Sequence, residues 1–167
     1  YLPLYDGVDK LEIGIDPGAE IVASELNSPN RENPIVMYGT SILQGASASR
    51  PGMAATNIIG RRFDREVVNL GFSANAFLDK EIAELMSEVE ASAYVLDFVP
   101  NASVSQIKEL TIPFYRILRK KHRTTPIIFV EDPQFPSAVY NRVLADEIRA
   151  KNEALQLVYK ELQKEKE

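Results

Sequence analysis

Short apolar runs rich in β-branched residues alternate along most of this chain with longer stretches of helical spacing. The runs predict strands at Ile35 to Tyr38, Glu66 to Leu70, Ala93 to Phe98 and Pro126 to Val130. Their apolar character is nearly continuous, which is typical of strands covered on both faces. The order therefore predicts βαβ units, and an α/β fold of three layers with a parallel sheet of at least four strands.

Helical spacing fills the gaps between these runs. It predicts helices at Met53 to Phe63, Lys80 to Glu90, Ser105 to His122 and Val139 to Lys166. Asp79 is the expected cap of the second of these helices. Pro113 should kink or divide the third, because proline lacks the N–H of the helical ladder.

The first 33 residues have a different pattern. Leu11 to Ile15 alternates apolar and polar residues between two turn signals, which predicts a half-buried strand. Ser24 to Asn33 is polar and is interpreted as a linker. We therefore expect a remnant of a β-rich module at residues 1–33 and an α/β domain at residues 34–167, which is incomplete at its carboxyl end.

Composition narrows the possible functions. Nineteen Lys and Arg against 24 Asp and Glu give a net charge of −5, so capture of nucleic acid by a basic face is not expected. With no Cys and one His, the 167 residues predict no thiol nucleophile and no metal site, and nothing in them predicts a cofactor. No apolar run reaches the roughly 20 residues needed to span a bilayer. Oligomeric state cannot be inferred.

The predicted strands all end in turns that carry polar side chains or glycine. Ser41 follows the first strand, Gly71 the second and Asn101 the third. Ligands bind at the carboxyl ends of parallel strands, where the turns converge. A hydroxyl, a bare backbone N–H and an amide are parts of an ester-hydrolysing site. Each position also has an ordinary interpretation, as a turn serine, a turn glycine and a cap.

Two acidic residues share that edge of the predicted sheet. Asp97 ends the third strand and Asp132 follows the fourth. Their ordinary interpretation is that they cap helices or turns.

Several ordered blocks resemble the SGNH, or GDSL-like, esterase superfamily. Tyr38 to Gly45 is similar to the first block, Asn69 to Asn75 to the second and Asp97 to Asn101 to the third. Ala48 to Ala54 and Val130 to Pro133 are similar to a bacterial branch described as GDSL-like lipases or acylhydrolases.

The resemblance covers roughly residues 34–140 and departs from the family pattern at a few positions. Thr40 stands where many members have Asp, and Ala74 and Ala76 replace glycines common in the second block. The branch often carries a β-rich domain in front of the hydrolase domain, which would explain residues 1–33.

The resemblance implies a flavodoxin-like fold and a serine esterase. It implies that Ser41 is the nucleophile and that the Ser41 and Gly71 N–H groups and the Asn101 amide form the oxyanion hole. Members take their base from an Asp-x-x-His motif, which is expected beyond Glu167, so this chain alone should be nearly inactive. His122, the one histidine, is expected at the opposite edge of the sheet, solvated among basic residues.

The resemblance also implies a small-molecule or carbohydrate acyl ester as substrate, with sugar-linked acetyl groups as one class, and a periplasmic or secreted location. Two alternatives remain open. The turn from Thr40 to Ser47 could cradle a phosphate in a flavodoxin-like nucleotide-binding module. The chain could also be a non-catalytic scaffold.

Overall fold

The computed structural model describes residues 1–22 and 32–164. Its strands are β1 (Ile35–Gly39), β2 (Val67–Gly71), β3 (Ala93–Asp97) and β4 (Ile127–Phe129). Its α-helices are α1 (Ser41–Gln44), α2 (Ala55–Phe63), α3 (Lys80–Met86), α4 (Val104–Lys121) and α5 (Arg142–Lys164), and two short 3-10 helices are η2 (Pro51–Met53) and η3 (Pro136–Val139).

The four strands form one parallel sheet in the order β2-β1-β3-β4. Gly39 at the end of β1 is in register with Gly71 of β2 and with Asp97 of β3. The predicted α/β fold and its four strands are confirmed, with strand ends shifted by at most one residue. Because three strands end at the same level, the turns that follow them start side by side.

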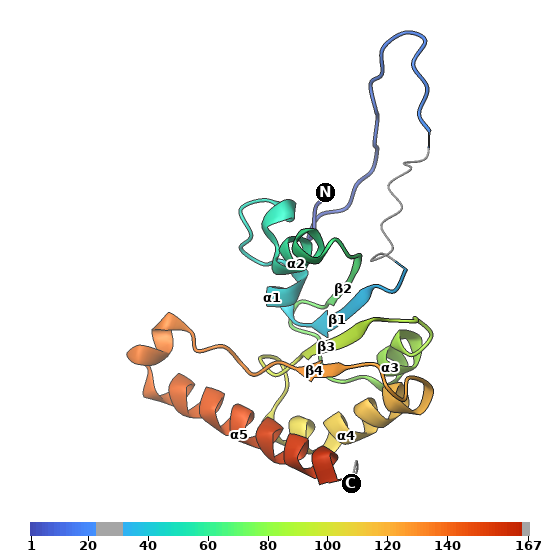
Figure 1. The fold of residues 1–167 in the computed structure, drawn as a ribbon. Helices are drawn as coiled ribbons and strands as arrows, with labels where there is room; N and C mark the ends of the chain where they lie inside the picture. Colours follow the sequence, from blue (N-terminus) through green and yellow to red (C-terminus); the bar gives the residue numbers. More distant parts are fainter. Residues whose placement is uncertain (23–31, 165–167) are drawn as a thin grey trace.

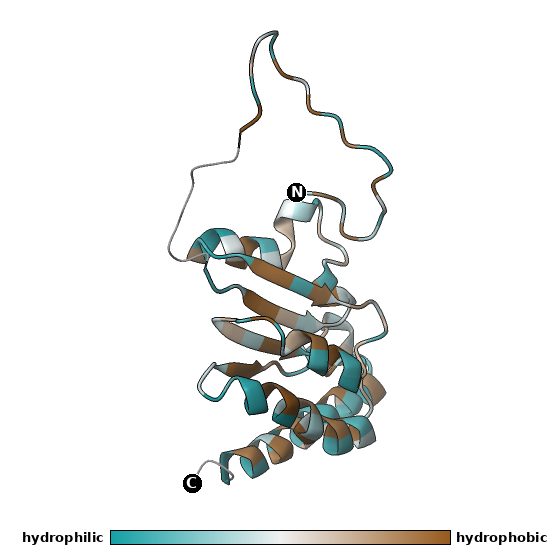
Figure 2. Cartoon of the chain, turned by 90° about the vertical axis from the view of Figure 1, so that its right-hand side faces the viewer, coloured by the Kyte–Doolittle hydropathy of each residue, from teal (hydrophilic) through white to brown (hydrophobic). Residues whose placement is uncertain are grey.

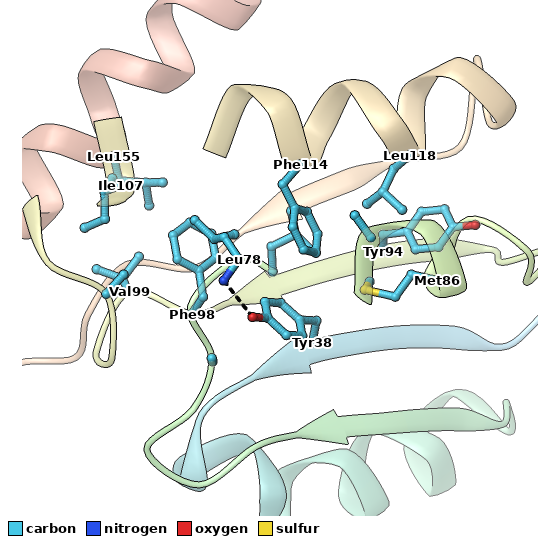
Figure 3. Close-up of a cluster of buried hydrophobic side chains, with 14 of the residues drawn as sticks. Tyr38, Leu78, Met86, Tyr94, Phe98, Val99, Ile107, Phe114, Leu118 and Leu155 are labelled. Atoms are coloured by element: carbon cyan, nitrogen blue, oxygen red, sulfur yellow. Dashed lines mark hydrogen bonds between the residues drawn. The ribbon is translucent and has the colours of Figure 1, made fainter. Parts of the chain in front are cut away.

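One face of the sheet carries the main core (Figure 3). Tyr38 from β1 and Tyr94 and Leu96 from β3 are fully buried there. They pack against apolar side chains of the helices, among them Met86, Phe114, Leu118 and Leu155. Figure 2 shows the same arrangement by hydropathy, with apolar strands inside and helices whose polar sides face outward.

The helices α1 and α2 lie at the β2 end of the sheet, and α4 and α5 lie at the β4 end (Figure 1). Asn69 of β2 links the sheet to α1 and α2. Its Nδ2 donates to Thr56 Oγ1 of α2 at 3.1 Å and to the Leu43 carbonyl of α1 at 3.2 Å. Helices thus flank the sheet, as expected. In the described part of the chain no helix is long and apolar enough to cross a membrane.

Helix α4 is continuous through Pro113, so of the kink or division predicted there, the division does not occur. Its start is fixed by a capping box, in which Ser103 Oγ accepts from the Gln106 N–H and the Gln106 side chain accepts from the Ser103 N–H. The buried side chains of α4, Phe114 among them, hold the helix together across the missing N–H of the proline.

The other helix predictions need small corrections. The predicted Lys80 to Glu90 ends at Met86, and Asp79 stands at its N-cap without a side-chain capping bond. The segment at Val139 was predicted as the start of a long helix, but it ends η3, and α5 begins at Arg142. The short helix α1 lies where only a turn was predicted, because the Thr40 side chain caps it.

The strand predicted at Leu11 to Ile15 is wrong. The described residues 1–22 contain no strand, and Leu11, Ile13 and Ile15 are 50 to 68 % exposed. An alternating segment needs a second strand and a face to cover, and no described residue supplies them here. The predicted linker falls mostly outside the described residues. The chain's first residues instead contact α1 and α2, where the Leu4 carbonyl accepts from Gln44 Nε2 at 3.0 Å.

Candidate active site

Ser41 is the first residue of α1 and follows β1 by two positions. Thr40 is buried and its Oγ1 accepts a hydrogen bond from the Ile42 N–H at 3.3 Å, which fixes the turn between strand and helix. The Ser41 carbonyl accepts from Tyr5 Oη at 3.1 Å. Among the described residues, none bonds to the Ser41 hydroxyl or to its N–H. Both groups are therefore free for a ligand.

Gly71 ends β2 directly beneath α1. A Cβ built on Gly71 would lie 2.2 Å from the Gln44 nitrogen and 2.4 Å from Gln44 Cα. Glycine is required there because the backbone of α1 approaches too closely for any side chain. The Gly71 N–H donates to Asn69 Oδ1 at 2.9 Å, so a substrate oxygen would have to displace the Asn69 side chain to reach it.

The loop after Gly71 is held by three side chains from different elements. Gln44 Oε1 accepts from the Ser73 N–H at 2.9 Å, Asn101 Oδ1 from the Ala76 N–H at 3.3 Å, and Tyr38 Oη from the Leu78 N–H at 2.9 Å (Figure 3). Burial raises the pKa of Tyr38 to about 12, so its hydroxyl stays neutral at physiological pH.

Between Phe72 and Ala76, one N–H has no partner among the described residues. Phe72 donates to the Gly39 carbonyl and Asn75 to the Phe72 carbonyl, and the groups named above are paired, which leaves Ala74. Ala74 is exposed and has a φ of 54°, a left-handed conformation that favours glycine. In the sequence, the signal for this position is that Ala74 replaces a glycine common in the second block of the resemblance.

Asn101 lies in the turn between β3 and α4, which closes through the Asn101 N–H to the Phe98 carbonyl at 3.0 Å. Its side-chain oxygen accepts a hydrogen bond from the Ala76 N–H. The amide Nδ2 is consequently the end of the side chain that remains for another acceptor.

The hydrogen bonds connect all three turns. Gln44, at the end of the short helix α1 that begins at Ser41, bonds the loop after β2, and that loop bonds Asn101. Together with the shared strand register, these bonds bring Ser41, Gly71 and Asn101 to one edge of the sheet. These three residues thus share one edge of the sheet, as their positions after the strands predict. Gln44 was missed, because a glutamine in a turn gives no chemical signal in the sequence.

Asp97 and Asp132 are not helix or turn caps, so that expectation is wrong. Ser103 caps α4, and the Asp132 backbone is held by Asn152 on both sides, with N···Oδ1 at 2.7 Å and O···Nδ2 at 3.0 Å. Burial and the neighbouring Asp132 raise the pKa of Asp97 to about 6. Burial also raises the pKa of Asp132, against the nearby Lys151, and its Oδ1 is buried with no partner among the described residues.

His122 lies at the amino edge of the sheet, as predicted, but it is buried and not solvated. It is 6 % exposed, and its Nε2 bonds the Ser87 carbonyl at 2.8 Å. Its ring packs on Tyr94 near the start of β3, with centroids 5.2 Å apart. This bond explains the burial and keeps the imidazole away from Ser41.

Within the described ranges, no group of three or more His, Asp or Glu is placed to hold a metal ion. The arrangement offers instead a free hydroxyl beside N–H donors at the end of a parallel sheet. These are components of an acyl-transfer site.

The fold and this edge are those of an α/β protein with a parallel sheet, and comparisons with known proteins identify the family. The sequence profile of the GDSL-like lipase/acylhydrolase family matches residues 32–167. A crystal structure of a Bacteroides ovatus ATCC 8483 protein described as a GDSL-like lipase is 38% identical, with a TM-score of 0.79 over 82% of this chain and 41% of that one. This chain belongs to the GDSL-like lipase/acylhydrolase family.

A second solved structure shares the fold. The salicylyl-acyltransferase SsfX3 from a tetracycline biosynthetic pathway is 20% identical, with a TM-score of 0.63 over 80% of this chain and 40% of that one. The chain thus spans about two-fifths of the length of these structures. No curated protein matches it.

Proposed function

We propose that this chain is the nucleophile-bearing part of a serine esterase that hydrolyses acyl esters through an acyl-Ser41 intermediate. The observation that carries the proposal is the free Ser41 hydroxyl, linked through Gln44 and the loop after β2 to Asn101. Family membership supports the same class of chemistry.

In the proposed mechanism, Ser41 Oγ attacks the ester carbonyl as a base takes the hydroxyl proton, and the carbonyl oxygen becomes an oxyanion. Collapse of this intermediate breaks the ester C–O bond and releases the alcohol, which takes the proton back, and water then hydrolyses acyl-Ser41 to the acid and free serine. The Ser41 N–H and Asn101 Nδ2 stabilise this oxyanion, and the loop after β2 supplies a third donor. Gly71 was the predicted third donor, but its N–H is occupied by Asn69. The unpaired Ala74 N–H is the better candidate in the same loop.

The base in this mechanism is not His122. That side chain is buried on Ser87 at the other end of the sheet. A general base must come within about 3 Å of the proton it removes. We therefore propose that residues 1–167 by themselves turn over slowly. The oxyanion donors alone leave a small residual rate.

The proposed substrate is a small or carbohydrate-linked acyl ester, with acetylated sugars as one class. Ser41 is half-buried at the end of the sheet, and its hydroxyl has no partner among the described residues, which suits an ester whose alcohol group extends away from the sheet. The phosphate-binding alternative is disfavoured, because family membership points to acyl hydrolysis.

The test is hydrolysis of p-nitrophenyl acetate by the full-length protein. Ser41→Ala should abolish turnover, whereas Ser137→Ala, at an exposed serine of η3, should leave it unchanged. Asn101→Ala should lower kcat by about 100-fold or more, as for loss of one oxyanion donor. Turnover that survives Ser41→Ala would refute the proposal, and absence of any turnover would favour the scaffold interpretation.

A further inference from the structure

Helix α5 has a lysine where its pattern requires an apolar residue. The buried side chains of α5 are Ile148, Lys151, Ala154, Leu155, Val158 and Leu162, a stripe with spacings of three and four. Lys151 is 8 % exposed, although lysine is almost never buried without a partner. A residue that breaks the local pattern at a cost in desolvation is expected to serve another purpose.

The ammonium group of Lys151 binds the turn that carries Asn101. Its Nζ donates to the Pro100 carbonyl at 3.2 Å and lies 2.9 Å from Glu147 Oε1 on the preceding turn of α5. The Pro100 carbonyl and the Asn101 nitrogen belong to the same planar peptide unit. A bond to this carbonyl therefore restrains the direction in which the Asn101 side chain leaves the backbone.

The surrounding charges keep this lysine in place. The Asp132 carboxyl, buried at the end of β4, interacts with Lys151 electrostatically, as does Glu147. Asp97, next to Asp132, adds negative charge from the end of β3. Lys151 thus lies near these acidic side chains and connects α5 to the turn that carries Asn101.

We propose that Lys151 is a positioning residue for acyl transfer, which holds Asn101 Nδ2 toward the oxyanion through the Pro100 carbonyl. This inference rests on the proposed function. Lys151 does not touch the substrate, so its loss acts on the rate of the chemical step and not on substrate binding.

The experiment compares Lys151→Met with Lys160→Met, a change at an exposed lysine of the same helix, in the full-length protein with p-nitrophenyl acetate. A misplacement of about 1 Å can lower the rate about 100-fold. Lys151→Met should lower kcat by about 10- to 100-fold, with KM changed less than about twofold, and Lys160→Met should have no effect. Lys151→Gln, which keeps a long polar chain, replaces the methionine variant if that variant does not fold.

A double-mutant cycle with Asn101→Ala separates positioning from general damage to the structure. If Lys151 acts through Asn101, Lys151→Met should cause little further loss of kcat once the amide is gone. The Asn101 side-chain NH₂ resonances in a ¹⁵N spectrum should also shift in Lys151→Met and not in Lys160→Met.

Three results have distinct meanings. An equal loss of kcat from Lys151→Met in the wild-type and Asn101→Ala backgrounds would overturn the positioning role. Unchanged kcat in Lys151→Met, with Ser41→Ala inactive, would also overturn it and leave the proposed function intact. Activity that survives Ser41→Ala would instead refute the proposed function.

Discussion

Gly71→Ala tests whether the glycine serves packing or hydrogen bonding, because alanine keeps the backbone N–H. The added Cβ would lie 2.2 Å from the Gln44 nitrogen and 2.4 Å from its Cα, and both are backbone atoms of α1. Restoring an ordinary contact requires α1 to move by more than about 1 Å, since neither β2 nor the helix backbone can rotate aside as a side chain would. Overpacking of this kind costs about 1 to 3 kcal/mol of unfolding free energy, occasionally more.

The same displacement moves Ser41, which begins α1, so the rate of acyl transfer should fall about 100-fold. Urea denaturation gives the stability and p-nitrophenyl acetate turnover gives the rate. Gly14→Ala is the matched control, because nothing lies within 4 Å of its added Cβ, and it should change neither quantity. If the unfolding free energy of Gly71→Ala were within about 0.5 kcal/mol of the wild-type value and the variant were fully active, the close approach of α1 would not be the reason that glycine is required.

Three further predictions concern stability. The pKa of Asp97 is raised to about 6 in the folded protein, so its contribution to stability is present at low pH and is lost as the pH rises through about 6. In urea titrations, Asp97→Asn should therefore flatten the dependence of the unfolding free energy on pH between pH 4 and 7. At pH 7.5 it should raise the unfolding free energy by about 1 to 2 kcal/mol, after discounting for solvent screening. His122→Ala should destabilise by about 1 to 3 kcal/mol, because the Ser87 carbonyl loses its partner, and should leave labelling of Ser41 by an ester probe unchanged. Pro113→Ala should raise the thermal midpoint, since it restores one helical hydrogen bond within α4, and a lower midpoint would show that the proline contributes packing instead.

Much of the fold followed from the sequence because its elements are set locally. Apolar β-branched runs and Gly- or Pro-bearing turns give strands their limits, and all four predicted strands are present. The failures lie where tertiary contacts decide. Leu11 to Ile15 alternates like a strand but has no neighbouring strand among the described residues. Helix α4 continues through Pro113 because it has buried side chains on both sides of the proline.

The candidate site was predictable only in part for the same reason. Ser41 and Asn101 follow strands, so the position of each at the sheet edge could be derived from topology. Gln44 and Lys151 act through hydrogen bonds to residues that lie 29 and 51 positions away in the sequence. No local sequence pattern predicts such distant partners. The burial of His122 likewise depends on Ser87, which lies 35 positions before it in the sequence.

The central claim is that the Ser41 hydroxyl is the nucleophile of an acyl-transfer site completed by Asn101. The most direct measurement is mass-spectrometric mapping of the adduct formed by a fluorophosphonate probe, with the labelling rate recorded for wild type and Asn101→Ala. We expect one adduct, on Ser41, and labelling at least about tenfold slower without the Asn101 amide. An adduct on another residue, or equal labelling of Ser41→Ala, would contradict it.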